Sequence, residues 1–153
     1  MSKGIEFTNI RGENLKISIV VARWNNDVTG VLLDECKKSL LEAGVADEDI
    51  SINEVPGSFE LVYGAAHAIK EYSPDAVIAI GCLVKGETMH FEYIAEAVSN
   101  GLAQLNAAGD VPVIFGVLTC LSEEQARERS AGEKSHGRGW ALSAIEMGRL
   151  SKQ

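Results

Sequence analysis

Three segments of the sequence gather polar, aromatic and glycine residues in patterns that suit ligand binding and proton transfer. Each of them follows an apolar run of the kind that predicts a β-strand. The segments are Arg23-Trp24-Asn25-Asn26, Val55-Pro56-Gly57-Ser58-Phe59-Glu60-Leu61, and the run from Gly81 to Phe91. Strand ends of a parallel sheet meet at one edge, so the sequence predicts a single site formed by these three segments.

The stretch Lys85-Gly86-Glu87-Thr88 in the third segment has the composition of a phosphate-binding turn. Gly86 permits close approach of the backbone, Thr88 can cap the helix that follows, and a helix N-terminus attracts phosphate. The spacing of a Walker loop is absent. Lys85 could act as a Schiff-base nucleophile, but a lysine that accompanies a phosphate is the simpler interpretation.

His90 falls in the first turn of the helix predicted after this stretch. Imidazole moves protons near neutral pH, so His90 is a candidate general acid and base. A single histidine is more often structural, and spacing alone leaves that alternative open. His67, in an alanine-rich stretch, is interpreted as structural, whereas His136, in the glycine-rich segment 132–139, is ambiguous.

Four further candidates each allow two interpretations. Trp24 could offer a flat face to an aromatic ligand or could plug the end of the core. Ser58 could bind a ligand at a helix start or serve only as an N-cap. Glu60 could accept hydrogen bonds from ligand hydroxyls or favour the helix dipole. Arg129 could reach a phosphate, although compensation of a helix dipole is the commoner role.

The elements that must position these residues follow from the apolar pattern. Short runs rich in Val and Ile alternate with longer stretches of helical periodicity, such as Leu32, Cys36 and Leu40. Strands are predicted over 15–22, 50–55, 76–84 and 111–120, and helices over 28–43, 61–72, 91–106, from a capping box at Ser122 onward, and over 140–150.

This alternation predicts an α/β fold with a four-stranded parallel sheet covered by helices on both faces. Ligands of such sheets bind at the carboxyl ends of the strands. The 153 residues fit one domain, 1–153, without a linker or internal repeat. Residues 1–13 fit none of the units, and we expect them to form an arm whose extra strand pairs with a neighbouring subunit and covers a sheet edge.

Composition limits the class of partner. The net charge of -8 argues against nucleic acid, which demands a basic surface. No apolar run is long enough to span a membrane, and the start lacks a signal-peptide pattern, so the expected location is the cytoplasm. Cys36, Cys82 and Cys120 are too far apart in sequence for a zinc motif, and we expect reduced, packed thiols and no metal site.

Five segments together resemble signature segments of the lumazine synthase family, in the same order and separation over nearly the whole chain. They are Arg23-Trp24-Asn25, Val55-Pro56-Gly57-Ser58-Phe59-Glu60-Leu61, Lys85-Gly86-x-Thr88-x-His90-Phe91-Glu92-Tyr93, Phe115-Gly116-Val117-Leu118-Thr119 and Ala144-Ile145-Glu146-Met147.

The resemblance implies a flavodoxin-like three-layer α/β/α sandwich that assembles as a homopentamer with active sites between adjacent subunits. It implies the penultimate step of riboflavin biosynthesis, in which 5-amino-6-ribitylaminouracil condenses with 3,4-dihydroxy-2-butanone 4-phosphate. The product is 6,7-dimethyl-8-ribityllumazine, and phosphate and water are released. No cofactor is expected, and riboflavin synthase is a candidate partner.

The resemblance also implies residue roles. Trp24 would stack on the pyrimidine, Ser58, Phe59 and Glu60 would hold the ring and the ribityl chain, and Cys82, Leu83 and Val84 would line the ring pocket. Phe115 would come from the adjacent subunit. Glu87 and Thr88 would present N–H groups to the phosphate, Arg129 would neutralise it, and His90 would be the proton shuttle.

This sequence departs from the family pattern at two places. Glu87 stands where relatives often carry a small residue, so we expect its side chain to point away from the phosphate. Ser130 interrupts the Arg-Ala-Gly pattern common after the phosphate arginine, and the loop that follows is short. Two rival functions are a non-catalytic shell-forming or flavin-binding relative, and a phosphate- or nucleotide-binding regulator; turnover with both substrates would separate them from the enzyme.

Overall fold

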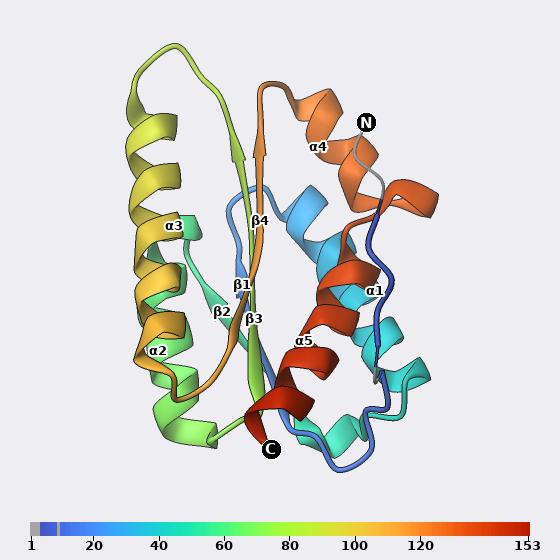
Figure 1. The fold of residues 1–153 in the computed structure, drawn as a ribbon. Helices are drawn as coiled ribbons and strands as arrows, with labels where there is room; N and C mark the ends of the chain where they lie inside the picture. The colour runs from blue at the N-terminus through green and yellow to red at the C-terminus, as the bar shows by residue number, and fades with distance from the viewer. Residues whose placement is uncertain (1–3, 9) are drawn as a thin grey trace.

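A four-stranded parallel sheet forms the centre of the computed structural model, which describes residues 4–8 and 10–153 (Figure 1). The strand order β2-β1-β3-β4 places β1 and β3 in the middle. The strands are β1 (Ile17–Ala22), β2 (Ile50–Val55), β3 (Ala76–Val84) and β4 (Val113–Cys120). The predicted parallel sheet is confirmed, with β2 and β3 bounded as the sequence indicates.

The α-helices of the described residues cover the two faces of the sheet, as Figure 1 shows. α1, α4 and α5 lie against one face, and α2 and α3 against the other. The helices are α1 (Asn26–Glu42), α2 (Leu61–Tyr72), α3 (His90–Ala108), α4 (Glu123–Ser130) and α5 (Gly137–Ser151). The expected three-layer α/β/α sandwich is therefore confirmed.

Each face of the sheet has its own apolar core, because successive strand residues point to opposite sides. Ile19 and Ile78 pack toward α1 and α5, whereas Val20 and Val77 pack toward α2 and α3. All four side chains are fully buried. Because the central strands are packed on both faces, they provide a rigid support for the loops that follow them.

Helix ends follow the signals in the sequence. Gly44 adopts φ 103°, and the N–H groups of Gly44 and Val45 donate to the carbonyls of Leu41 and Leu40, which ends α1. The Ser122 hydroxyl accepts the N–H of Gln125 at 3.2 Å and caps α4. The Gln125 side chain returns to the N–H of Leu121, one residue before the N-cap, so the expected capping box takes a slightly shifted form.

The N-terminal arm contains no strand in residues 4–8 and 10–13 of this single chain. Thr8 donates its N–H and its hydroxyl to one carboxylate oxygen of Glu146 on α5, at 2.8 and 2.6 Å. Pairing of this arm with a neighbouring subunit stays a prediction, and part of it, at residues 1–3 and 9, lies outside the described residues. No helix in the described ranges has the length and apolar character of a membrane span.

Candidate active site

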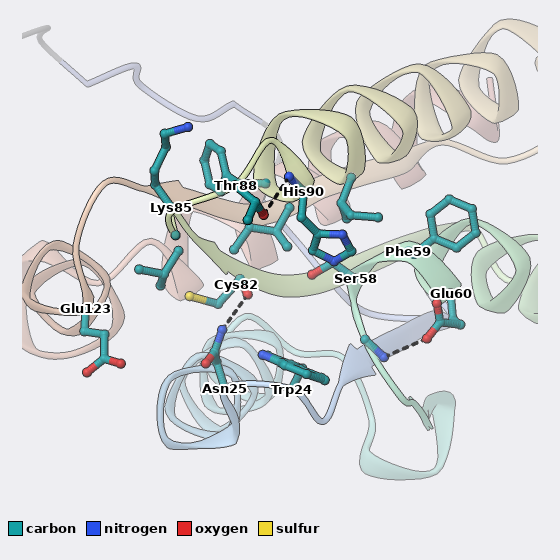
Figure 2. A pocket seen from close by; sticks show the side chains of 16 residues that line it. Trp24, Asn25, Ser58, Phe59, Glu60, Cys82, Lys85, Thr88, His90 and Glu123 are labelled. Atoms are coloured by element: carbon teal, nitrogen blue, oxygen red, sulfur yellow. Dashed lines mark hydrogen bonds between the residues drawn. The ribbon is translucent and has the colours of Figure 1, made fainter.

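A cavity of about 700 Å³ opens where β1, β2 and β3 end (Figure 2). This is the edge of the sheet that the three sequence segments predict. Its walls come from Trp24, Asn25, Gly57, Ser58, Phe59, Glu60, Cys82, Leu83, Val84, Lys85, Gly86, Thr88, His90, Phe91, Ile94 and Glu123. Nine of the twelve sequence-predicted site residues are therefore brought together by the fold.

Trp24 forms one wall of the cavity on the loop after β1. Its side chain is 72% exposed, which excludes the interpretation of a plug in the core of this chain. The loop is anchored to the end of β2 because the N–H groups of Arg23 and Trp24 donate to the carbonyls of Val55 and Pro56, at 2.9 and 3.0 Å. An exposed indole held in this way can stack on a planar ligand.

Ser58 and Glu60 lie on the turn between β2 and α2. Gly57, and not Ser58, is the N-cap of this turn, and Glu60 accepts the N–H of Gly57 at 3.1 Å. The Ser58 hydroxyl oxygen is buried and has no hydrogen-bond partner in the described chain. A buried hydroxyl without a partner is unfavourable, so the cavity presents an unused polar group that a ligand can satisfy.

The third wall comes from the end of β3 and the start of α3. His90 is the first residue of α3, and its N–H donates to the Thr88 hydroxyl at 3.4 Å. Figure 2 shows Thr88 and His90 across the cavity from Trp24. The exposed N-terminus of α3 here suits an anion, and an imidazole beside it can exchange protons with a bound ligand.

Lys85 is paired within the chain. Its ammonium group forms an ion pair and a hydrogen bond with Glu92 of α3 and lies 5.9 Å from the centre of the Phe91 ring. The Lys85 hydrogen bond lowers the pKa of Glu92. The ion pair spans the turn from 85 to 92, so it braces the start of the helix that carries His90.

Glu87, Phe115 and Arg129 do not line the cavity. Phe115 lies on the edge strand β4 and is 42% exposed. Arg129 donates to the carbonyl of Gln125 at 3.1 Å and lies 3.9 Å from Glu128. Phe115 and Arg129 contribute to the cavity of one chain only if the side chain reorients or if an adjacent copy supplies it, whereas Glu87, which is exposed, could contribute its backbone N–H alone.

The cysteines are all free thiols. Burial raises the pKa of Cys36 and of Cys82 to about 12, and it also raises that of Cys120. Cys82 therefore presents a neutral thiol beside the cavity and not a nucleophile. Among the described residues, no group of three or more His, Cys, Asp or Glu could hold a metal ion.

The two remaining histidines lie away from the cavity walls. His67 stacks on Tyr63 with ring centres 6.3 Å apart. His136 contacts the edge of Trp140, and burial, with a smaller contribution from Arg129, lowers its pKa. Neither arrangement brings the imidazole to the site.

Five wall residues were given no role by sequence reasoning: Asn25, Gly57, Phe91, Ile94 and Glu123. Ile94 lies one turn of α3 beyond His90, a spacing that could have indicated it. Glu123 comes from the first turn of α4, which only the folded chain brings near β3. Asn25 follows Trp24 directly, and its position at a strand end was the available signal.

The fold and the cavity define an α/β protein whose strands end at a cavity lined by an exposed indole, a buried hydroxyl and the N-terminus of a helix. A family model described as 6,7-dimethyl-8-ribityllumazine synthase matches residues 14–152. The chain belongs to this family.

Relatives from distant organisms agree with the family assignment. The chain is 46% identical over 136 residues to a 6,7-dimethyl-8-ribityllumazine synthase of Phocaeicola vulgatus, covering 88% of this chain and 81% of that protein. It is 46% identical to one of Bacteroides fragilis, covering 87% and 94%. It is 45% identical to one of Schizosaccharomyces pombe over 149 residues, covering 95% and 94%.

Proposed function

We propose that this chain is an enzyme that condenses 5-amino-6-ribitylaminouracil with 3,4-dihydroxy-2-butanone 4-phosphate to 6,7-dimethyl-8-ribityllumazine. The observation that carries the proposal is the cavity, which joins an exposed indole, an unpartnered buried hydroxyl and a histidine at a helix N-terminus. The names of the relatives support the enzyme over a non-catalytic shell-forming or flavin-binding protein.

The pyrimidine occupies the part of the cavity bounded by Trp24 and the end of β3 in this proposal. Trp24 stacks on the ring, and Cys82, Leu83 and Val84 form the floor beneath its edge. Ser58, Phe59 and Glu60 hold the ring and the ribityl chain. The support is that all seven residues line one cavity and that Ser58 has a hydroxyl free to bond.

The phosphate lies at the start of α3, where the N–H groups of Glu87 and Thr88 and the helix dipole face it. Arg129 supplies the balancing positive charge. Arg129 does not line the cavity of its own chain, so it reaches the phosphate by turning its half-buried side chain or from an adjacent subunit. Glu87 binds through its backbone, because its side chain is exposed outside the cavity walls.

His90 moves protons during the reaction. The amine of the pyrimidine attacks the ketone and loses water to give an imine. Elimination then releases phosphate, and the ribityl-bearing nitrogen attacks the remaining carbonyl with loss of a second water, which closes the second ring of the lumazine. Each step transfers a proton near one place, which one imidazole can serve. Confinement of two reactants in one cavity contributes a large share of the rate.

A homopentamer completes the site in this proposal, with Phe115 of an adjacent subunit covering the pyrimidine. It is supported by Phe115 on the exposed edge strand and by the exposed Tyr63 and Tyr93 of α2 and α3. The proposal includes one domain over 1–153 with an arm at 1–13, a cytoplasmic location, no cofactor, and riboflavin synthase as a partner that takes up the product. The family match over 14–152 supports the single domain.

The test is formation of the fluorescent lumazine from the two substrates, corrected for the spontaneous reaction. The wild-type protein should exceed that background by orders of magnitude. Arg129→Ala should raise KM for the butanone phosphate by about tenfold, the value of one charge-assisted hydrogen bond, and leave KM for the pyrimidine unchanged. Arg127→Ala is the matched control, since Arg127 of the same helix pairs with Asp27 and Glu123 instead.

Wild-type protein that is folded but does not exceed the background would overturn the proposed function. Binding of the pyrimidine without turnover would then favour the non-catalytic relative. If Arg129→Ala and Arg127→Ala behaved alike, the phosphate role of Arg129 would be rejected while the enzyme assignment remained.

A further inference from the structure

Asn25 has an unusual conformation at the junction of β1 and α1. It is the N-cap of α1, yet its backbone is left-handed, with φ 62° and ψ 45°. N-cap residues are usually extended and accept a hydrogen bond from an N–H of their own helix. The Asn25 side chain makes no such bond. The orientation of the Asn25 side chain is therefore not explained by capping of α1.

The Asn25 amide reaches across to β3 instead. Its Nδ2 donates to the carbonyl of Cys82 at 2.9 Å, between residues 57 positions apart in sequence (Figure 2). Cys82 lies near the end of β3 and lines the cavity. A left-handed conformation costs energy for any residue with a Cβ, although asparagine tolerates it better than most. Such a cost at a site wall indicates a functional constraint.

This hydrogen bond continues the junction of β1 and β3 beyond the sheet. Backbone pairing of the two strands runs from Ile17↔Ala76 to Val21↔Ile80. Past that point the Asn25 amide connects the two strand ends. On the other side of the same loop, the N–H of Trp24 donates to Pro56 at 3.0 Å. The loop that carries Trp24 is thus held from both sides, by β2 through its backbone and by β3 through Asn25.

We propose that Asn25 is a positioning residue that sets the distance between the Trp24 ring and the end of β3, and thereby the width of the slot for the pyrimidine. It acts through Trp24 and Cys82 and not on reacting atoms. This inference rests on the proposed function for the identity of the planar ligand. The tether itself stands on the conformation of Asn25 and its bond to Cys82.

Two substitutions separate the tether from the backbone conformation. Asn25→Gly adopts the left-handed region freely but removes the amide. Asn25→Asp keeps the shape but replaces the donor by an oxygen facing the Cys82 carbonyl. Asn26→Asp is the matched control, because it places the same charge at the start of the same helix on an exposed neighbouring residue.

Kinetics with both substrates distinguish positioning from a purely structural role. We expect Asn25→Gly to raise KM for the pyrimidine about tenfold, on the scale of one hydrogen bond, and Asn25→Asp to raise it further. KM for the butanone phosphate should not change. Loss of folded protein alone would lower apparent kcat and leave KM as it was. An unchanged KM for the pyrimidine in both variants would overturn the proposal.

Fluorine NMR of 5-fluorotryptophan protein gives a readout that does not depend on activity. The chain has two tryptophans, and Trp24→Phe assigns their resonances. Asn25→Gly should shift or sharpen the Trp24 signal and leave that of Trp140 unmoved, whereas Asn26→Asp should change neither. If wild type lacked turnover while the Trp24 signal still responded, only the proposed function would fail. Turnover with an unresponsive Trp24 signal would reject the tether.

Discussion

The two ends of the sheet satisfy their polar groups in different ways. At the amino ends, Asp75 accepts the N–H of Lys16 at 2.7 Å and lies 3.6 Å from the Lys152 ammonium. Asn106 binds both the N–H and the carbonyl of Val113, at 2.8 and 3.0 Å. The polar groups of these residues are thus satisfied by partners within the chain.

At the carboxyl ends, some side chains are exposed or lack a hydrogen-bond partner. Trp24 is largely exposed, and the Ser58 hydroxyl is buried without a partner. Asn25 is held left-handed to reach Cys82. The side chains at the amino ends bond to one another within the fold, and we propose that those at the carboxyl ends bind a ligand. Substitutions at the carboxyl ends should therefore change activity, and those at the amino ends should change stability.

His90→Ala should give the largest change, confined to activity. We expect kcat to fall by about 100-fold, at the lower end for a proton-transfer residue, because confinement of the reactants persists. His90 is exposed, so the free energy of unfolding should stay within about 0.5 kcal/mol. Single-turnover kinetics and urea denaturation measure the two quantities. A large loss of stability would contradict the proposal that residues at the carboxyl ends of the strands affect activity alone.

Trp24→Ala should lower kcat/KM for the pyrimidine by about 30-fold, which corresponds to about 2 kcal/mol of lost ring contact. The indole contributes little to folding in this chain because it is mostly exposed. Trp140→Phe is the contrasting variant, since Trp140 packs against the core and should affect stability instead. Equal kinetic effects of the two variants would contradict the assigned role of Trp24.

Asp75→Ala probes the amino ends. It removes a charged acceptor from the Lys16 N–H and one partner of Lys152, and we expect a loss of about 2 kcal/mol in the free energy of unfolding. KM and kcat of the folded protein should not change. Asp110→Ala, at an exposed acid before β4, is the control and should cost little. An altered KM in Asp75→Ala would show that the ends are coupled.

A pair of buried serines gives the smallest and sharpest contrast. Ser58→Ala should raise the free energy of unfolding by about 1 kcal/mol, because it removes an unpartnered hydroxyl, and should raise KM for the pyrimidine a few-fold. Ser18→Ala should lower stability by about 1 kcal/mol, because its hydroxyl bonds to that of Ser51 at 2.7 Å, with no kinetic change. Thermal unfolding resolves the opposite signs; the same sign in both would break the comparison.

The sequence predicted most of the fold because periodicity reports burial. The predicted strand starts were wrong where a side chain of another element forms hydrogen bonds with the backbone. β1 begins at Ile17 and not at residue 15, because Asp75 binds the N–H of Lys16. β4 begins at Val113 and not at residue 111, because Asn106 bonds to both polar groups of Val113. The first contact joins residues 59 positions apart and the second spans the loop between α3 and β4, and neither changes the apolar periodicity from which strands are predicted.

Glycine misled the prediction of α5. The segment 132–139 suggested a loop, yet the helix begins at Gly137 and not at Trp140. A Cβ on Gly137 would lie 2.9 Å from the Cβ of Glu35 and 3.0 Å from the carbonyl of Leu32, so glycine here permits close packing of α5 on α1. Glycine at this position therefore serves close contact between two helices and does not mark a flexible loop.

The sequence predicted those site residues that directly follow a strand. Trp24, Ser58 and His90 could be named because each follows an apolar run. The role of Asn25 could not, since it depends on a carbonyl 57 residues away. Phe115 and Arg129 lie outside the cavity of one chain, and the family resemblance indicated them, whereas their spacing alone did not.

A crystal structure of the protein soaked with 5-amino-6-ribitylaminouracil and inorganic phosphate would locate both ligands. We expect the pyrimidine against Trp24, with a hydrogen bond to the Ser58 hydroxyl, and phosphate at the N–H groups of 87 and 88 near His90. Both ligands should leave the amino ends of the strands empty. A pyrimidine bound elsewhere, or a Ser58 hydroxyl still unpartnered in the occupied site, would contradict the account.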